Sequence, residues 1–139
     1  MPETVLFACT QNAGRSQMAA ALFNQLADPS RARAISAGTS PASRVHANVV
    51  TVMRERGVDL SGAVPQRLTA DLAASADLLV TMGCGEDCPV VPGLAREDWP
   101  IPDPAGRSLD EVRDIRDGLL TRVTDLIARY NRQTRTTGT

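Results

Sequence analysis

The sequence predicts an α/β fold: a single domain of three layers, in which helices cover both faces of a four-stranded parallel sheet. Short apolar runs alternate along the chain with longer segments whose apolar residues recur at helical spacing, as expected of a parallel sheet with crossover helices. The 139 residues suit one domain, and 42% apolar with 22% charged residues is an ordinary globular composition. We therefore expect one domain over residues 1–139.

The first half of the chain contains two predicted strands and two predicted helices. The apolar runs at 4–8 and 33–37 are short and bounded by polar residues, as expected of buried strands. Segments 16–27 and 46–56 predict amphipathic helices, and Gly57 is the expected stop of the second. Their apolar faces are expected to consist of Met18, Ala21, Leu22 and Leu26 in the first and Val49, Val50, Val52 and Met53 in the second.

The second half predicts two more strands and two more helices. A short helix is expected at 69–74, with its first residue as the cap, and the run at 77–82 is the clearest strand of the chain. After a loop rich in Gly, Pro and Cys, residues 99–101 predict the fourth strand. The last helix is expected at 109–130, and the polar tail at 131–139 is expected to fray. The apolar stripe of this helix comprises Val112, Ile115, Leu119, Leu120, Val123, Leu126 and Ile127.

Residues able to do chemistry follow the predicted strands at their carboxyl ends. Cys9 follows the first strand, Cys84 the third and Asp103 the fourth. In open parallel sheets, ligands bind beyond the carboxyl ends of the strands. We therefore expect these three side chains to belong to one site.

The loop between the first strand and the first helix has the residues of an oxyanion-binding loop around a nucleophilic cysteine. Backbone N–H groups of such a loop point inward, and the positive end of the helix dipole adds to their field. Arg15 can direct two N–H donors at a tetrahedral oxyanion, while the same field stabilises the thiolate of Cys9. Ser16 is placed to donate to the sulfur, Asn12 tolerates a left-handed backbone, and Gly14 relieves crowding. The predicted oxyanion-binding residues are Thr10, Gln11, Asn12, Ala13, Gly14, Arg15 and Ser16.

The segment 9–19, which reads CTQNAGRSQMA, resembles the signature of arsenate reductases built on the low-molecular-weight tyrosine phosphatase fold, of the thioredoxin-coupled type. Further matches lie at 36–38, 80–82 and 103–106, and the resemblance extends over about residues 4–128. It implies the four-stranded sheet with flanking helices and a thiol-coupled reduction of arsenate to arsenite. Phosphate and sulfate are then the expected competing oxyanions.

The resemblance also implies roles for the remaining site residues. Cys9 attacks arsenate, Cys84 attacks the resulting thiol–arsenic adduct and expels arsenite, and Cys88 then takes over the disulfide. Thioredoxin or a low-molecular-weight thiol system would reduce that disulfide, and no cofactor is implied. Asp103 is placed like the family's general acid. In a regular helix the Cβ atoms of Cys84 and Cys88 would be ~5–6 Å apart, wider than the ~3.5–4.5 Å of a disulfide, so their loop should be non-helical when oxidised.

Other interpretations stay open. The chain could be a low-molecular-weight tyrosine phosphatase that uses Cys9, Arg15 and Asp103, although scarce aromatic residues leave little to form a phosphotyrosine pocket. It could be a non-catalytic sensor of arsenite or a metal, with Cys84 and Cys88 as ligands, although the usual paired zinc spacing is missing. External thiols could also resolve the adduct. Finally, Cys9 and Arg15 could have no catalytic role, with Cys9 a buried core cysteine and Arg15 an ordinary cation at the start of a helix.

Charge and hydropathy narrow the classes of partner. A net charge of −1 and a pI of about 5.8 give no electrostatic case for nucleic acid or an anionic membrane. No apolar run approaches the ~18–20 residues of a membrane span, and without an export signal the three cysteines are expected to be cytoplasmic thiols. Ala20 and Gln66 stand where some family members have acidic ligands of a monovalent cation, which argues against that site. We expect a packing role for Trp99, a helix-start position for His46, and a solvated face formed by Arg113, Arg116, Arg122 and Arg129.

Overall fold

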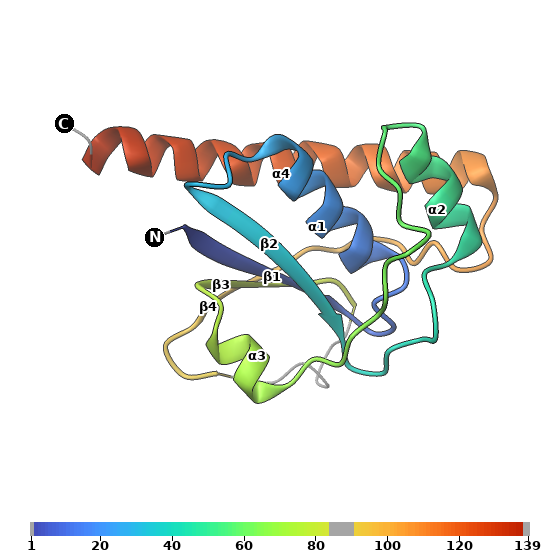
Figure 1. Cartoon of the computed structure of the whole chain (residues 1–139), viewed down its shortest axis with the longest axis horizontal. Helices are drawn as coiled ribbons and strands as arrows, with labels where there is room; N and C mark the ends of the chain where they lie inside the picture. Colours follow the sequence, from blue (N-terminus) through green and yellow to red (C-terminus); the bar gives the residue numbers. More distant parts are fainter. Residues whose placement is uncertain (1, 84–90, 138–139) are drawn as a thin grey trace.

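The computed structural model describes residues 2–83 and 91–137, with residues 132–137 as backbone only. It contains the predicted four-stranded parallel sheet, in the order β2-β1-β3-β4 (Figure 1). The strands are β1 (Glu3–Cys9), β2 (Ala32–Gly38), β3 (Leu78–Thr81) and β4 (Ala95–Asp98). Residues 5–8 of the central strand β1 are completely buried, which agrees with their unbroken apolar sequence.

The register of the sheet brings the carboxyl ends of its strands to one edge. Cys9, the last residue of β1, pairs with Gly38 at the end of β2, and Ala8 pairs with Thr81 at the end of β3. Thr81 in turn pairs with Asp98, the last residue of β4. The loops that leave all four strands therefore begin side by side, as the topology requires for a single site.

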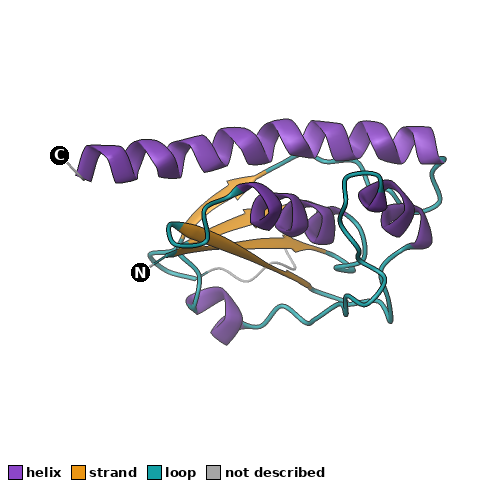
Figure 2. Ribbon diagram, turned by 45° about the horizontal axis from the view of Figure 1, so that its top comes forward, coloured by secondary structure: helices purple, strands orange, loops and turns teal. Residues whose placement is uncertain are grey.

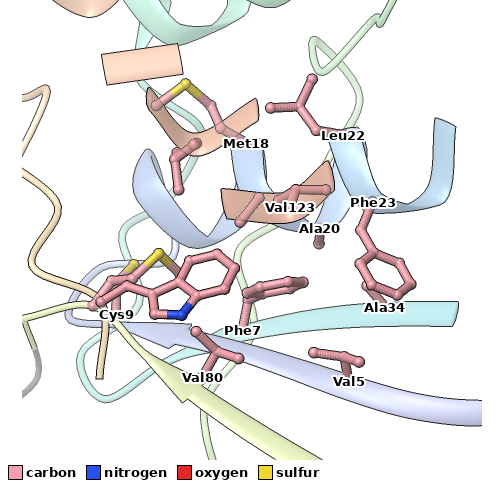
Figure 3. Close-up of a cluster of buried hydrophobic side chains, with 14 of the residues drawn as sticks. Val5, Phe7, Cys9, Met18, Ala20, Leu22, Phe23, Ala34, Val80 and Val123 are labelled. Carbon is pink, nitrogen blue, oxygen red and sulfur yellow. The ribbon is translucent and has the colours of Figure 1, made fainter. Parts of the chain in front are cut away.

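Helices cover both faces of the sheet unequally. On one face lie α1 (Arg15–Leu26), α2 (Ala47–Arg54) and the long α4 (Leu109–Thr137), whereas the short α3 (Ala70–Ala74) lies on the other (Figures 1 and 2). The larger core fills the space between the sheet and the helices α1, α2 and α4 (Figure 3). Its largest completely buried side chains include Phe7, Met18, Leu22, Phe23 and Met53. The sulfur-bearing Cys9 lies at one end of this core, only 2% exposed.

Most predicted elements agree with the structure to within one or two residues. Thr69 caps α3 through a hydrogen bond from the Leu72 N–H to its hydroxyl, as predicted. Gly57 has φ of +76° just after α2, which confirms it as the stop of that helix. The predicted apolar face of α1 was partly wrong, because Leu26 is 44% exposed and Phe23 is buried in its place. The last helix runs to Thr137, past the predicted end at residue 130.

The predicted fourth strand is wrong. The strand is Ala95–Asp98, just before residues 99–101, and its exposed, charged residues carry no apolar pattern because it lies at the edge of the sheet. The backbone N–H of Trp99 still donates to the Thr81 carbonyl at 2.9 Å. The prolines at 100 and 102 have no backbone N–H, so they cannot continue the hydrogen-bond ladder of the strand. The apolar signal of Trp99 comes from core packing, as predicted: it is 5% exposed and its ring centroid lies 5.6 Å from that of Phe7.

The predicted solvated arginine face on α4 is confirmed in part: Arg122 and Arg129 are exposed, whereas the side chain of Arg116 is only 12% exposed. The four side chains also contact other segments. Arg113 and Arg116 both bind Glu55, just after α2, at N···O distances of 2.8 and 2.7 Å. Arg129 binds Glu97 of β4 at 2.7 Å, and Arg122 lies over the ring of Trp99. These partners lie in segments distant in the sequence. The sequence pattern of α4 shows only the acidic residues within the helix, so it could not predict these contacts. Among the described residues, no helix is both long and apolar enough to cross a membrane.

The pairing of Glu55 with α4 predicts a pH-dependent contribution to stability. Hydrogen bonds from Arg113 and Arg116 lower the pKa of Glu55 from 4.5 to about 2. A lowered folded-state pKa stabilises the fold fully above 4.5, and this contribution is lost as the pH falls toward 2. Glu55→Gln should therefore lower the melting temperature at pH 7 by about 1–3 °C, because the pair is exposed. Thermal unfolding from pH 7 to pH 3 should show the wild type and the variant converging below pH 4.5, and a constant difference would contradict this assignment.

Candidate active site

The loop of residues 9–16, called here the oxyanion loop, joins β1 to α1 and is braced from outside by residues 39–46. Four backbone N–H groups of this bracing segment donate to carbonyls of the loop at N···O distances of 2.8–3.2 Å. The donors are Thr39, Ser40, Ala42 and His46, and the acceptors are Cys9, Thr10, Gln11 and Ala13. With its carbonyls bound on the outside, none of the N–H groups of residues 10–16 donates to a described residue. They remain available to an anion, as the sequence predicts.

Ser16 is oriented to donate its proton to the sulfur of Cys9. The two side chains are 2.9 Å apart, a distance that alone leaves the donor undecided. The side-chain amide of Asn12 donates to the same serine oxygen at 2.7 Å. Because that bond occupies a lone pair of the hydroxyl, the serine proton is free to point at the sulfur. Ser16 lies in the first turn of α1, so the sulfur that it contacts also lies near the positive, N-terminal end of that helix.

Asn12 adopts the left-handed conformation that the sequence predicts, with φ of +51°. Its side chain is completely buried, and its Oδ1 accepts from Gln17 Nε2 at 3.1 Å and from the Gln66 N–H at 2.9 Å. These two bonds hold Asn12 in the orientation that reaches Ser16. Neither partner was predicted, although a polar glutamine on the buried first turn of α1 was a signal for the first. Of the two positions compared with a family cation site, Gln66 donates to Asn12 through its backbone and to the Ser36 carbonyl through its side chain, and Ala20 is a buried core residue.

Two glycines permit close approaches to the oxyanion loop. A Cβ on Gly14 would lie 2.6 Å from Pro104 Cγ, which confirms that this glycine relieves crowding. A Cβ on Gly38 would lie 2.6 Å from the Thr10 carbonyl oxygen and 2.8 Å from the Asn12 nitrogen. The second contact is with backbone, which cannot swing aside. The sequence marks Gly38 as the end of a strand but does not reveal this contact.

Arg15 links the oxyanion loop to the segment that carries Asp103. Its guanidinium donates to the Ile101 carbonyl at 3.3 Å and lies 3.8 Å from the Asp103 carboxylate. The Arg15 side chain is 12% exposed, whereas that of Asp103 is 56% exposed. A Cβ on Gly83 would lie 2.4 Å from Arg15 Nη1, so the guanidinium is packed directly against this glycine. The structure thus places Asp103 beside Arg15 of the loop that begins with Cys9, whereas Cys84, the third residue expected at this site, lies outside the described residues.

Cys84 and Cys88 lie outside the described residues, so the predicted thiol relay and the alternative of a cysteine metal site remain predictions. Among the residues that the structure describes, no three His, Cys, Asp or Glu side chains are arranged to hold a metal ion. His46 occupies the N-cap position of α2, as predicted, and its backbone N–H donates to Ala13.

Comparison with known protein families assigns the chain. Residues 4–136 match the family described as low molecular weight phosphotyrosine protein phosphatase. The chain belongs to this family. The resemblance seen in segment 9–19 is confirmed, and the family's framework agrees with the four-stranded parallel sheet of this structure.

Similar members of the family are named for two kinds of chemistry. A glutaredoxin arsenate reductase from Synechocystis is 34% identical over 130 residues, which cover 91% of this chain and 98% of that protein. The thioredoxin-dependent arsenate reductase Cg_ArsC1' of Corynebacterium glutamicum is 37% identical with a TM-score of 0.81; the match covers 95% of this chain but only 63% of that one. The YwlE arginine phosphatase of Geobacillus stearothermophilus is 25% identical, with a TM-score of 0.82 over 97% of both chains. The fold alone therefore does not separate reduction from phosphate transfer.

Proposed function

We propose that this chain reduces arsenate to arsenite, with the thiolate of Cys9 as the nucleophile. The observation that carries the proposal is the oxyanion loop: a buried cysteine that accepts a hydrogen bond from Ser16, beside Arg15 and a row of N–H groups that bind no described residue. Such a loop suits a tetrahedral dianion of the size of arsenate or phosphate. Arsenate reductases among similar family members support arsenate as the substrate.

The first step forms a bond between sulfur and arsenic. Arsenate binds to the N–H groups and Arg15, and the thiolate of Cys9 attacks arsenic while one arsenic–oxygen bond breaks. Asp103, beside Arg15, donates the proton with which that oxygen leaves as water. Arsenic is still pentavalent in this thiol adduct, so no electrons have yet been transferred to it.

The second part of the reaction transfers two electrons to arsenic. In the proposed relay, the thiolate of Cys84 attacks the sulfur of Cys9, the sulfur–arsenic bond breaks, and arsenite leaves with the electron pair. Cys88 then attacks Cys84, which frees Cys9 and leaves a Cys84–Cys88 disulfide. Thioredoxin or a low-molecular-weight thiol system returns both thiols to the reduced form. Because the relay needs reduced thiols, we place the protein in the cytoplasm.

The second candidate is a phosphatase that uses Cys9, Arg15 and Asp103 on a phosphate ester. The close match to an arginine phosphatase favours it, since the oxyanion loop alone would serve either substrate. Phosphate transfer gives no use for Cys84 or Cys88, and this difference separates the two candidates.

The test compares turnover of arsenate with turnover of p-nitrophenyl phosphate, with thioredoxin or a small thiol supplied in turn. The proposal expects arsenite formation sustained by a reductant, with p-nitrophenyl phosphate turned over slowly at most. Rapid ester hydrolysis without arsenite formation would assign the chain to the phosphatases instead.

The relay is tested by the disulfides present after one turnover of arsenate, mapped by mass spectrometry of alkylated peptides. The wild type should contain a Cys84–Cys88 disulfide, whereas Cys88→Ser should release one equivalent of arsenite and retain Cys9–Cys84. Cys84→Ser should stop multiple turnover with thioredoxin. If both variants turn over normally with a small thiol and no internal disulfide forms, the reaction uses Cys9 and external thiols alone.

A further inference from the structure

The segment that carries Asp103, residues 103–107, is called here the acid loop and is held by a side chain from α2. Asn48 Nδ2 donates to the carbonyl of Pro104 at 2.9 Å and to that of Arg107 at 3.3 Å. Within the acid loop, Arg107 Nε donates to the Asp103 carbonyl at 2.7 Å and the Ala105 N–H donates to the Asp103 carboxylate at 3.0 Å. The internal hydrogen bonds fix the conformation of the acid loop, and Asn48 joins the loop to α2.

The amide of Asn48 has a defined orientation. Two carbonyl acceptors require the NH₂ end, so the Oδ1 atom faces the other way. That oxygen is buried and has no hydrogen-bond partner in the described part of the chain. A buried acceptor without a partner typically destabilises a fold by about 1–3 kcal/mol. The unpaired oxygen of asparagine therefore destabilises the fold at this position. Among its described contacts, the two hydrogen bonds that it donates to the acid loop are what offset this cost.

The acid loop also rests on the oxyanion loop. The ring of Pro104 packs so closely against Gly14 that a Cβ there would lie 2.6 Å from it. This contact prevents the acid loop from moving inward, and the Asn48 bonds oppose outward movement. The ion pair between Asp103 and Arg15 cannot replace them, because it is 3.8 Å long and its carboxylate is 56% exposed. Exposed pairs of this kind hold a side chain weakly.

We propose that Asn48 is a positioning residue, which fixes Asp103 over the oxyanion loop through the backbone of the acid loop. The inference rests on the proposed role of Asp103 as the general acid. The two hydrogen bonds that Asn48 donates go to backbone carbonyls of the acid loop, so it would act on Asp103 through that loop. Its effect on the reaction follows from geometry, since a displacement of about 1 Å in a catalytic group can lower a rate by about 10²-fold.

The test uses Asn48→Leu, which keeps the branched shape of the side chain, with larger terminal groups, and removes both donors. We expect kcat to fall at least about tenfold, while the inhibition constant of phosphate changes less than about twofold, because the oxyanion loop is unchanged. Hydrogen exchange at the amides of residues 105–108 should become faster. Asn48→Ala provides a second variant should leucine impair folding. An unchanged kcat together with unchanged exchange in a folded variant would overturn the proposal.

The matched control is Asn24→Leu. Asn24 on α1 also joins two elements through its side-chain amide, donating to the Ala34 carbonyl at 2.9 Å and accepting from the Ala34 N–H at 2.8 Å. It lies beside the middle of β2 rather than at the carboxyl edge. Its loss should lower the melting temperature and leave kcat and exchange in the acid loop unchanged. An equal fall in kcat would show that the Asn48 effect is general destabilisation.

A double substitution separates positioning from other roles. If Asn48 acts through Asp103, then Asn48→Leu should change kcat no further in the Asp103→Asn background. Additive effects would overturn the positioning role alone, whereas an Asp103→Asn variant with unchanged turnover would overturn the acid role and the positioning role together. The cycle can be measured with arsenate or with p-nitrophenyl phosphate, since the acid protonates a leaving oxygen in either. Its outcome is therefore independent of which substrate the chain prefers.

Discussion

Replacement of Cys9 by serine is expected to abolish turnover while the protein remains folded. Removal of the nucleophile in a covalent mechanism lowers kcat by more than about 10⁴-fold. A serine hydroxyl forms no comparable anion near neutral pH, so the bond donated by Ser16 and the field of the loop would have no thiolate to stabilise. The measurements are arsenite formation and hydrolysis of p-nitrophenyl phosphate, and both should fall to background.

Phosphate binding provides the control for this variant. Arg15 and the N–H groups of the oxyanion loop are retained, so phosphate should still raise the melting temperature of Cys9→Ser as it does in the wild type. Loss of that shift would mean that the substitution has disrupted the loop instead of removing the nucleophile. A Cys9→Ser variant with more than about one hundredth of wild-type turnover would contradict nucleophilic catalysis by this residue.

The fold could be predicted wherever a segment carries its own apolar pattern. The central strand β1 is an unbroken buried run, and the helices α2 and α4 bury residues at helical spacing. The positions of β1 and α2 and the start of α4 agree with the prediction. The edge strand β4 has no such pattern, because its residues are mostly exposed and are held by backbone pairing with β3. The prediction therefore placed the strand at the nearest apolar residue, Trp99, which lies just after the actual strand.

The candidate site shows the same division between local and distant contacts. Cys9, Asn12 and Ser16 lie within a single short loop, so the Ser16–Cys9 contact and the left-handed backbone of Asn12 could be predicted from spacing and residue type. The bond from Asn12 to Ser16 was not predicted. The contacts that support the loop join segments far apart in the chain: the Gln66 N–H reaches Asn12 across 54 positions, and Asn48 reaches Pro104 across 56. No periodicity in one sequence reveals such pairs. The roles of Cys84 and Cys88, which lie outside the described residues, stay predictions.

Arg15→Lys is expected to lower kcat/KM by about 10²–10³-fold, the usual effect of removing one donor from a preorganised oxyanion site. The guanidinium presents several N–H donors from one plane: it reaches the Ile101 carbonyl while its other terminal nitrogen faces Asp103. A lysine ammonium is a single point charge and cannot donate from two positions at once. Lysine would also lose the flat contact beneath Gly83, where there is no room for a Cβ. The inhibition constant of phosphate should rise along with the loss of turnover.

The matched control for this last prediction is Arg31→Lys, because Arg31 forms an ion pair with Asp28 at the same 3.8 Å distance but lies beside the start of β2. Both substitutions keep the net charge, so a general effect of exchanging arginine for lysine would appear in both. Turnover should fall only in Arg15→Lys, and the melting temperatures of both variants should stay within about 3 °C of the wild type, because neither pair is a strong contributor to stability. If Arg15→Lys keeps kcat/KM within about threefold, one positive charge suffices, and two-point binding of the oxyanion by the guanidinium is wrong.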